Sequence, residues 1–307
     1  MKNLVDGFTV DERTPKPDCQ ACTEAKLSVK PFPTIAKRRA TRPGQITHLD
    51  ISGKISIESI NGNQYFMVLV DGYMHRVKVD PMPTKDTSTE KAKAYLMYLK
   101  THGMNPEELW IDGGGEFKEL VEWCKEEGIH VQMTAPYSPS QNGTAERMMR
   151  TLVELGRAML QARKLPHFLW ELAVLHAAYI RDRAYTRTLQ GKTPFEAWEK
   201  EKPNVAHLRE FGSPVWILRQ GQHKGRKFDP KSTKKVFVGF EDGSRSVKYY
   251  NPETRKILTS RNYRFLSVSD NHPEPTEGVE IDISPEILHE GEQKEVEMLN
   301  AAKKGNN

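Results

Sequence analysis

Residues 46–82 read ITHLDISGKISIESINGNQYFMVLVDGYMHRVKVDPM, and this stretch contains three candidate strands. ITHLDIS (46–52) alternates enough for a strand, and YFMVLVD (65–71) is a continuous apolar run that suits a buried strand. HRVKVDPM (75–82) alternates at Val77 and Val79, and Asn61-Gly62-Asn63 is typical of a hairpin turn. The stretch therefore predicts three consecutive antiparallel strands.

Helices and strands alternate in the segment that follows. Apolar spacing predicts helices over 87–100 and 117–127, which end near Gly103 and Gly128, and short strands over 109–111 and 129–133. Two longer helices are expected over 144–163 and 167–183. The order β-β-β-α-β-α-β-α-α is typical of an α/β fold in which helices cover the faces of a mixed sheet.

The pattern changes again at Val205, where short strands alternate with turn residues. The segments PVWILR, KKVFVGF, VKYYNP and KILTSRNYRF are about ten residues apart, which predicts a small β-barrel. Residues 270–307 contain few apolar side chains and are expected to be disordered or weakly helical.

Charge is distributed unevenly along the 307 residues, whose net charge is +5. Residues 270–307 hold ten acids and three lysines, whereas residues 205–269 hold fourteen lysines and arginines and five acids. A basic folded part followed by an acidic tail favours a polyanionic partner, although ordinary solubility charge is the alternative.

Composition also restricts the class of protein. The longest apolar run, Tyr65 to Val70, is six residues, far below the roughly 20 that a membrane helix needs, so no membrane partner is expected. The N-terminal residues have no apolar stretch of the kind found in signal peptides. Three cysteines are too few for a disulfide framework, which indicates an intracellular protein.

Three carboxylates occupy positions where they can converge. Asp50 lies in the first predicted strand, Asp112 ends the fourth and precedes three glycines, and Glu146 opens a long helix. Ligands of open sheets gather at strand ends, and Mg²⁺ prefers hard oxygen ligands of this kind. Taken singly, each acid has another explanation: a strand-end turn, an Asx-turn, and a favourable helix start. Asp71 also follows a buried strand, and we expect it to start the next hairpin instead.

Several motifs resemble those of retroviral-type integrases, and in particular the integrase region of copia-type (Ty1/copia) LTR retrotransposon polyproteins. They are His48-Leu49-Asp50, Asp112-Gly113-Gly114-Gly115-Glu116-Phe117 and Pro139-Ser140-Gln141-Asn142-Gly143-Thr144-Ala145-Glu146-Arg147. Sixty-one residues separate the first two acids and thirty-three the last two. Thr193 to Trp198, Leu208 to Gly212 and Phe228 to Ser232 are similar to later segments of the same polyproteins.

The resemblance implies an RNase H-like mixed sheet with helices on both faces, followed by a small SH3-like β-barrel. It divides the chain into a partial zinc-knuckle remnant (1–36), a basic linker (37–45), the integrase catalytic core (46–185), a linker (186–204), the SH3-like barrel (205–269) and the acidic tail (270–307). The implied activity is metal-dependent transfer of element cDNA into target DNA. A decayed or domesticated inactive DNA-binding protein and an RNase H-type nuclease are the alternatives.

The resemblance also implies roles for individual residues. Asp50, Asp112 and Glu146 would be catalytic and would bind Mg²⁺ or Mn²⁺, and Gln141, Asn142, Gly143 and Arg147 would support the catalytic loop. Cys19 and Cys22 form half of a zinc site, so Zn²⁺ is expected only if a longer chain supplies the upstream histidine pair.

The expected partner is DNA, with RNA as a further possible partner, and the chain is expected to form a homo-oligomer in the nucleus. The candidate DNA contacts are basic residues in the linker and in the barrel segment: Lys37, Arg38, Arg39, Arg226, Lys227, Lys231, Lys234 and Lys235. Cys124 is expected to be a core residue.

Overall fold

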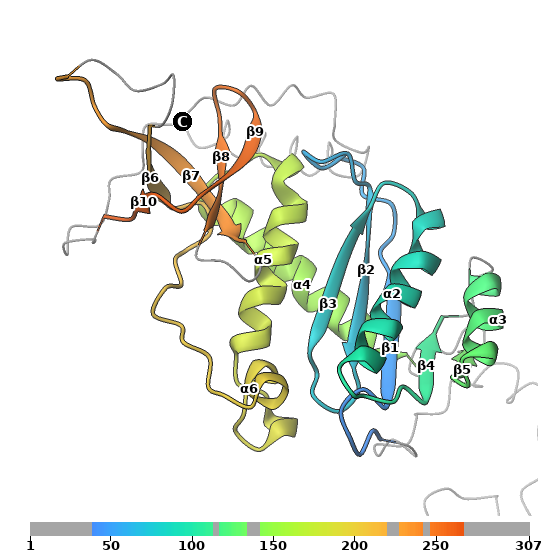
Figure 1. Cartoon of the computed structure of the whole chain (residues 1–307). Helices are drawn as coiled ribbons and strands as arrows, with labels where there is room; N and C mark the ends of the chain where they lie inside the picture. Colours follow the sequence, from blue (N-terminus) through green and yellow to red (C-terminus); the bar gives the residue numbers. More distant parts are fainter. Residues whose placement is uncertain (1–38, 113–116, 134–141, 220–226, 242–245, 267–307) are drawn as a thin grey trace, which may run out of the picture. The chain divides into compact units, whose positions relative to one another are not determined.

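The computed structural model describes residues 39–112, 117–133, 142–219, 227–241 and 246–266. Its first sheet has the strand order β3-β2-β1-β4-β5 (Figure 1). The β1–β2 and β2–β3 pairs are antiparallel, whereas the β1–β4 and β4–β5 pairs are parallel. The predicted mixed sheet is therefore confirmed, with these strands: β1 (Ile46–Ile51), β2 (Tyr65–Asp71), β3 (Val77–Met82), β4 (Glu108–Ile111) and β5 (His130–Met133).

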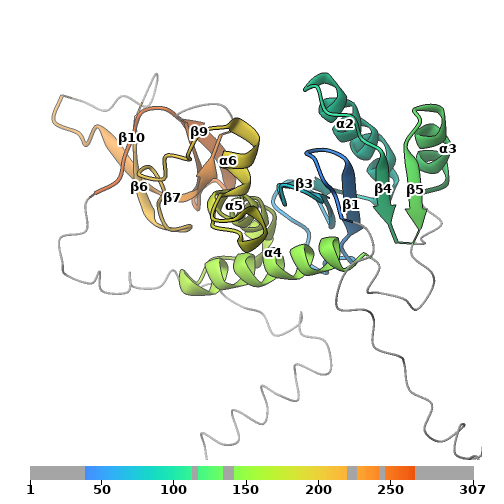
Figure 2. The same cartoon turned by 90° about the horizontal axis from the view of Figure 1, so that it is seen from below.

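Helices cover both faces of this sheet, as predicted. Figure 2 shows α2 (Ser88–Thr101) and α3 (Lys118–Glu126) on one side and α4 (Gly143–Ala162) on the other. The apolar run of β2 is continuous because the strand is buried on both faces, so that alternate residues enter two different cores. Met67 and Leu69 belong to the cluster that includes α2 and α3, and Phe66, Val68 and Val70 belong to the cluster that includes α4 and α5 (Trp170–Arg183).

The contact between α4 and α5 depends on a glycine. Gly156 lies on the buried side of α4, and a Cβ atom there would be 3.3 Å from Val174 Cγ2 and 3.4 Å from the Val174 backbone nitrogen. The two helices therefore approach closely at this point. The 3₁₀ turn η4 (His167–Leu169) precedes α5, so the helix expected from residue 167 becomes regular only at Trp170.

A second sheet follows, with the strand order β10-β6-β7-β8-β9 and antiparallel pairing throughout. Its arrangement fits an SH3-like domain, and its own core contains Val215, Ile217, Phe237 and Val247. Val238 and Tyr250 belong instead to the cluster that includes α5. The strands are β6 (Pro214–Leu218), β7 (Ser232–Phe240), β8 (Val247–Asn251), β9 (Lys256–Ser260) and β10 (Tyr263–Arg264).

Three short helical segments were not predicted: η1 (Lys85–Thr87), η5 (Arg187–Leu189) and α6 (Pro194–Glu199). The start of α6 follows from its sequence, because the Thr193 side chain accepts a hydrogen bond from the Glu196 backbone N–H at 3.0 Å. Proline at the first helical position completes this start signal. Among the helices of the described ranges, none has the length and apolarity needed to cross a bilayer.

Candidate active site

The sheet brings Asp50 and Asp112 to neighbouring strands. Asp50 lies on β1, at the centre of the sheet, and Asp112 follows the last residue of β4. The parallel register pairs His48 with Trp110, so continuing it by two residues places Asp50 beside Asp112. Neighbouring strands lie about 4.8 Å apart, which is close enough for the two carboxylates to influence each other.

A buried asparagine fixes the start of α4, and with it Glu146, against the same strand. Asn142 is 1% exposed and its side-chain Nδ2 donates a hydrogen bond to the Leu49 carbonyl at 2.7 Å. Leu49 directly precedes Asp50, and Glu146 lies in the first turn of α4. Asn142 occupies the N-cap position but makes no capping hydrogen bond there, because its amide is directed to β1.

The electrostatics of Asp50 reflect burial and the two other carboxylates. The pKa of the Asp50 carboxyl is raised to about 6, chiefly by burial and in smaller part by the charges of Glu146 and Asp112. The Ile51 backbone N–H, which donates to Asp50 Oδ1 at 2.9 Å, and the charge of Lys85 both lower this pKa. The net effect is a carboxyl group whose charged form is disfavoured by burial and by two like charges.

The same residues carry oxygen donors that could hold a metal ion. Among the His, Cys, Asp and Glu side chains of the described residues, no group of three is close enough to hold an ion. The charges of Glu146 and Asp112 nevertheless reach Asp50. The absence of a three-residue group within the described part of the chain and the charge effect on Asp50 are compatible, because carboxylates can influence one another's pKa at distances longer than those of metal ligands. Hard oxygen donors whose like charges repel one another are the donor set that suits Mg²⁺, so the residues fit this metal.

His48 lies on the same face of β1 as Asp50, two residues earlier; it belongs to the motif His48-Leu49-Asp50, but no role of its own was predicted for it. Burial lowers the pKa of His48 to about 4, and its ring centroid lies 5.4 Å from that of Trp110. The Asn142 side chain beside it raises this pKa in part, and His48 Nδ1 and Asn142 Oδ1 are both buried. His48 is therefore neutral at physiological pH. Lys85 was also missed, because only the tertiary fold brings its charge to Asp50.

Two of the four residues expected to support the catalytic loop have clear structural roles. Asn142 anchors α4, and Gly143 leaves room for Arg147, since a Cβ atom on Gly143 would lie 2.7 Å from Arg147 Nη1. Arg147 itself is exposed on α4. Gln141 lies outside the described residues.

The residues proposed to contact DNA divide into three groups. Arg39, Lys227, Lys231 and Lys234 are exposed. Lys235 differs, because it is 8% exposed and its ammonium donates to Asn251 Oδ1 at 2.9 Å and to Glu253 Oε2 at 3.0 Å. Its charge is used within the second sheet. Lys37, Arg38 and Arg226 lie outside the described residues.

The cysteine predictions have different outcomes. Cys124 is a free cysteine in the core beside α2, as expected, and burial raises the pKa of its thiol to about 11. Cys19 and Cys22 lie outside the described residues, so the partial zinc site remains a prediction.

Comparison with protein families identifies two domains. Residues 40–139 match the integrase core domain, and residues 213–277 match the retroviral polymerase SH3-like domain. The matches follow the order of the two sheets along the chain.

Curated relatives are polyproteins of transposons. The chain is 31% identical over 255 residues to the retrovirus-related Pol polyprotein from transposon TNT 1-94 of Nicotiana tabacum, covering 82% of the chain and 19% of that polyprotein. It is 28% identical over 271 residues to the transposon RE1 polyprotein of Arabidopsis thaliana, covering 86% and 18%. It is 22% identical over 255 residues to the Ty1-DR6 Gag-Pol polyprotein of Saccharomyces cerevisiae, covering 81% and 14%. The chain thus spans less than a fifth of the length of these relatives.

Two solved structures align with parts of the chain. A simian T-cell lymphotropic virus intasome in complex with PP2A regulatory subunit B56 gamma aligns with a TM-score of 0.47 and 17% identity, covering 78% of this chain and 84% of that one. The HTLV-2 integrase catalytic core domain in complex with magnesium aligns with a TM-score of 0.39 and 21% identity, covering 52% and 99%. The two family matches and the transposon relatives together show that the chain belongs to the integrase region of copia-type retrotransposon Pol polyproteins, with an integrase core domain followed by an SH3-like domain.

Proposed function

We propose that the chain is a retrotransposon integrase that joins the 3′ end of element cDNA to target DNA in a metal-dependent reaction. The observation that supports this proposal most is the placement of Asp50 and Asp112 on neighbouring parallel strands of an integrase core domain, with the helix of Glu146 held against β1 by Asn142. The fold thus brings three acids that are distant in sequence toward one edge of the sheet, which none of their individual explanations requires.

In this proposal Asp50, Asp112 and Glu146 would hold Mg²⁺ or Mn²⁺. The bound ions supply activation of the attacking oxygen and stabilisation of the leaving one. Asp50 and Asp112 would share the ions, and Glu146 would complete the set. The chain contributes the positions of these charges: the Ile51 N–H orients Asp50, and Asn142 holds the start of α4 against β1.

The proposed reaction is an exchange of phosphodiester bonds. The 3′-hydroxyl oxygen of the cDNA forms a bond to a phosphorus atom of the target strand, and its proton is released. The bond from that phosphorus to the target 3′ oxygen breaks, and this oxygen leaves as a new 3′-hydroxyl after it gains a proton. Water replaces the hydroxyl as nucleophile when the cDNA end is trimmed.

DNA is the proposed partner because the reaction needs two DNA molecules and because exposed basic residues occur on the second sheet, Lys231 and Lys234 among them. Such contacts bind phosphates independently of sequence. Homo-oligomer formation and action in the nucleus belong to the same proposal and rest on the family resemblance.

The first test is the Asp112→Asn substitution, which removes one ligand charge from an exposed position. We expect strand transfer to fall by at least about a thousandfold, because the variant loses positioning and charge stabilisation together. DNA affinity, measured by fluorescence anisotropy in EDTA, should stay within a few fold of wild type.

A matched control is Glu154→Gln, which removes one exposed carboxylate from α4 two turns after Glu146. This variant should join DNA at the wild-type rate. Joining at the parent rate by Asp112→Asn would show that Asp112 does not belong to the reaction centre.

A further inference from the structure

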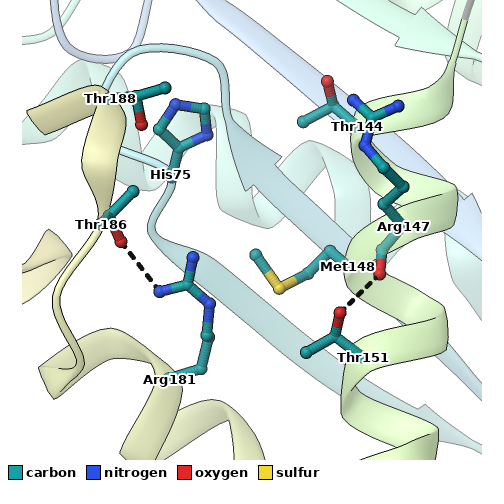
Figure 3. A pocket seen from close by; sticks show the side chains of 8 residues that line it. All are labelled: His75, Thr144, Arg147, Met148, Thr151, Arg181, Thr186 and Thr188. Atoms are coloured by element: carbon teal, nitrogen blue, oxygen red, sulfur yellow. Dashed lines mark hydrogen bonds between the residues drawn. The ribbon is translucent and has the colours of Figure 1, made fainter.

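A cavity of about 300 Å³ lies between the start of α4, the turn that joins β2 to β3, and the segment at the end of α5 (Figure 3). Most of its accessible surface is apolar, Met148 included, but two arginines bring positive charge to it. Arg147 comes from α4, His75 from the β2–β3 turn, and Arg181 from α5, with threonine side chains from α4 and from residues 186 and 188. These groups are separated by up to 113 residues in sequence and meet only through the fold.

Among the described residues the two arginines, Arg147 and Arg181, form no ion pair, although the charge of Arg181 does lower the pKa of the neighbouring Asp182. The acid that follows Arg181 in sequence, Asp182, pairs with Arg76 instead, with its Oδ2 3.3 Å from Arg76 Nε. Two unpaired guanidinium groups beside one cavity therefore give it a positive potential.

The arginine of α5 is held in place. Arg181 Nη1 donates to Thr186 Oγ1 at 2.9 Å, which uses one of the five N–H donors that a guanidinium carries. The remaining donors stay available to a ligand. Thr186 is buried, so the hydrogen bond fixes Arg181 against a rigid part of the structure.

The charges of both arginines reach His75, which stands above Arg181 in Figure 3. Burial lowers the pKa of His75, and the charges of Arg181 and Arg147 lower it further. The histidine is therefore neutral at pH 7 and adds a hydrogen-bonding group but no charge. Gly143 permits the position of Arg147, since any Cβ atom there would press on the guanidinium.

Guanidinium groups and hydroxyls together are the usual recognition set for a phosphate. An arginine can donate two parallel hydrogen bonds to phosphate oxygens, and threonine hydroxyls donate to the others. Thr144 and Thr186 stand near the two arginines on opposite sides of the cavity (Figure 3). The cavity is thus built for an oxyanion of tetrahedral shape.

We propose that this cavity binds one backbone phosphate of a DNA strand and so positions that strand relative to the carboxylates. Glu146 and Arg147 are consecutive residues of α4, so a strand held at Arg147 passes close to the acid that we place in the reaction centre. That the bound phosphate belongs to DNA rests on the proposed function. Arg147 and Arg181 are positioning residues in this account.

The test is the salt dependence of DNA binding, measured by fluorescence anisotropy in EDTA with a labelled duplex oligonucleotide and the full chain. The log–log slope of affinity against salt concentration should be smaller by about 0.9 in Arg181→Gln than in wild type, since one phosphate contact is lost. Arg181→Lys, which keeps the charge, should retain the wild-type slope. Affinity at low salt should fall about three- to tenfold in Arg181→Gln.

Arg157→Gln is the matched control, because Arg157 is exposed on α4 and does not line the cavity. Its slope should equal that of wild type. Thermal unfolding is measured on each preparation, and if Arg181→Gln does not fold, Arg147→Gln at an exposed position carries the same expectation. An unchanged slope in the folded variant, or an equal fall in Arg157→Gln, overturns the proposal.

A joining assay with Mg²⁺ on the same proteins separates this inference from the proposed function. Wild-type protein that joins DNA while Arg181→Gln keeps its slope overturns the phosphate site alone. In another outcome, Arg181→Gln has a smaller salt-dependence slope than wild type, but wild type joins no DNA. This outcome supports the phosphate site and overturns the proposed strand transfer. Wild-type protein that does not bind DNA in EDTA overturns the phosphate site.

Discussion

Two aspartates on neighbouring strands illustrate how local contacts decide the role of a residue. Asp71 ends β2, and its carboxylate accepts backbone hydrogen bonds from Gly44 at 2.6 Å, Tyr73 at 2.9 Å and Met74 at 2.5 Å. It closes the hairpin to β3, as its sequence position predicted. Asp50 accepts one backbone N–H and faces two acids, so its charge is not satisfied within the fold. The contrast favours a ligand role for Asp50 and a structural role for Asp71.

This contrast predicts opposite effects on stability. Because the pKa of Asp50 in the fold, about 6, is above its ordinary value of 3.8, ionised Asp50 destabilises the protein above pH 6, and the penalty fades as pH falls toward 3.8. Asp50→Asn should therefore raise the free energy of unfolding in EDTA by about 1 kcal/mol at pH 7.5, with no gain near pH 4.

Urea denaturation at the two pH values checks this expectation. Asp71→Ala is the contrasting variant and should lose about 2–3 kcal/mol at pH 7.5, because three buried N–H groups lose their acceptor. A loss of stability in Asp50→Asn at pH 7.5 would mean that the Asp50 carboxylate is well satisfied within the fold.

At the scale of elements, α5 is tied to the connection between β1 and β2. The carboxylate of Glu171, near the start of α5, is 6% exposed and accepts hydrogen bonds from Ser59 Oγ at 2.6 Å and from the side-chain amides of Asn61 and Asn63, each at 2.9 Å. The Ile60 N–H also donates to the Phe168 carbonyl at 2.8 Å. These contacts join the hairpin region to the helix that carries Arg181.

Glu171→Leu should therefore lower the free energy of unfolding by about 2–4 kcal/mol, since three polar side chains lose their acceptor. Thermal or urea unfolding measures the loss. Glu154→Gln, an exposed substitution on α4, should stay within about 0.5 kcal/mol of wild type. Equal stability of the two variants would show that the Glu171 contacts contribute little.

The sequence predicted most of these elements because their signals are local. Alternation and apolar runs identified β1, β2 and β3, and glycines near the helix ends placed the limits of α2 and α3 to within about two residues. The short helix α6 has a local signal too, the capping pattern from Thr193 to Glu196, which indicates a helix start without indicating its length.

The candidate site was predictable only in part. The three carboxylates were selected because they follow strand ends or open a helix next to a specific motif. His48, Lys85 and the cavity with Arg181 have no such signal, since their roles depend on contacts between distant elements. The burial of Lys235 had no sequence signal either, because it depends on contacts with Asn251 and Glu253, which lie 16 and 18 residues further along the chain.

At the scale of the whole molecule, α5 connects the two sheets in their packing. His176 of α5 lies with its ring centroid 5.5 Å from that of Phe211 and 5.6 Å from that of Phe237 on β7, and both of its ring nitrogens are buried without a partner among the described residues. Burial lowers the pKa of His176 to about 4. Helix α5 therefore packs against the SH3-like sheet at His176 and carries Arg181 further along.

In the proposed function, Asp50, Asp112 and Glu146 act as one metal-binding unit in DNA joining. The direct measurement is the rate at which a labelled duplex, ending in the terminal sequence of the element, is joined to plasmid DNA with Mg²⁺, with Mn²⁺ and with EDTA. It is made for wild type, for Asp50→Asn, for Glu146→Gln and for the double variant. The account predicts joining by wild type only with metal, and the same background rate in all three variants, because residues that act as a unit are not additive. Joining in EDTA, or substantial activity in either single variant, would contradict it.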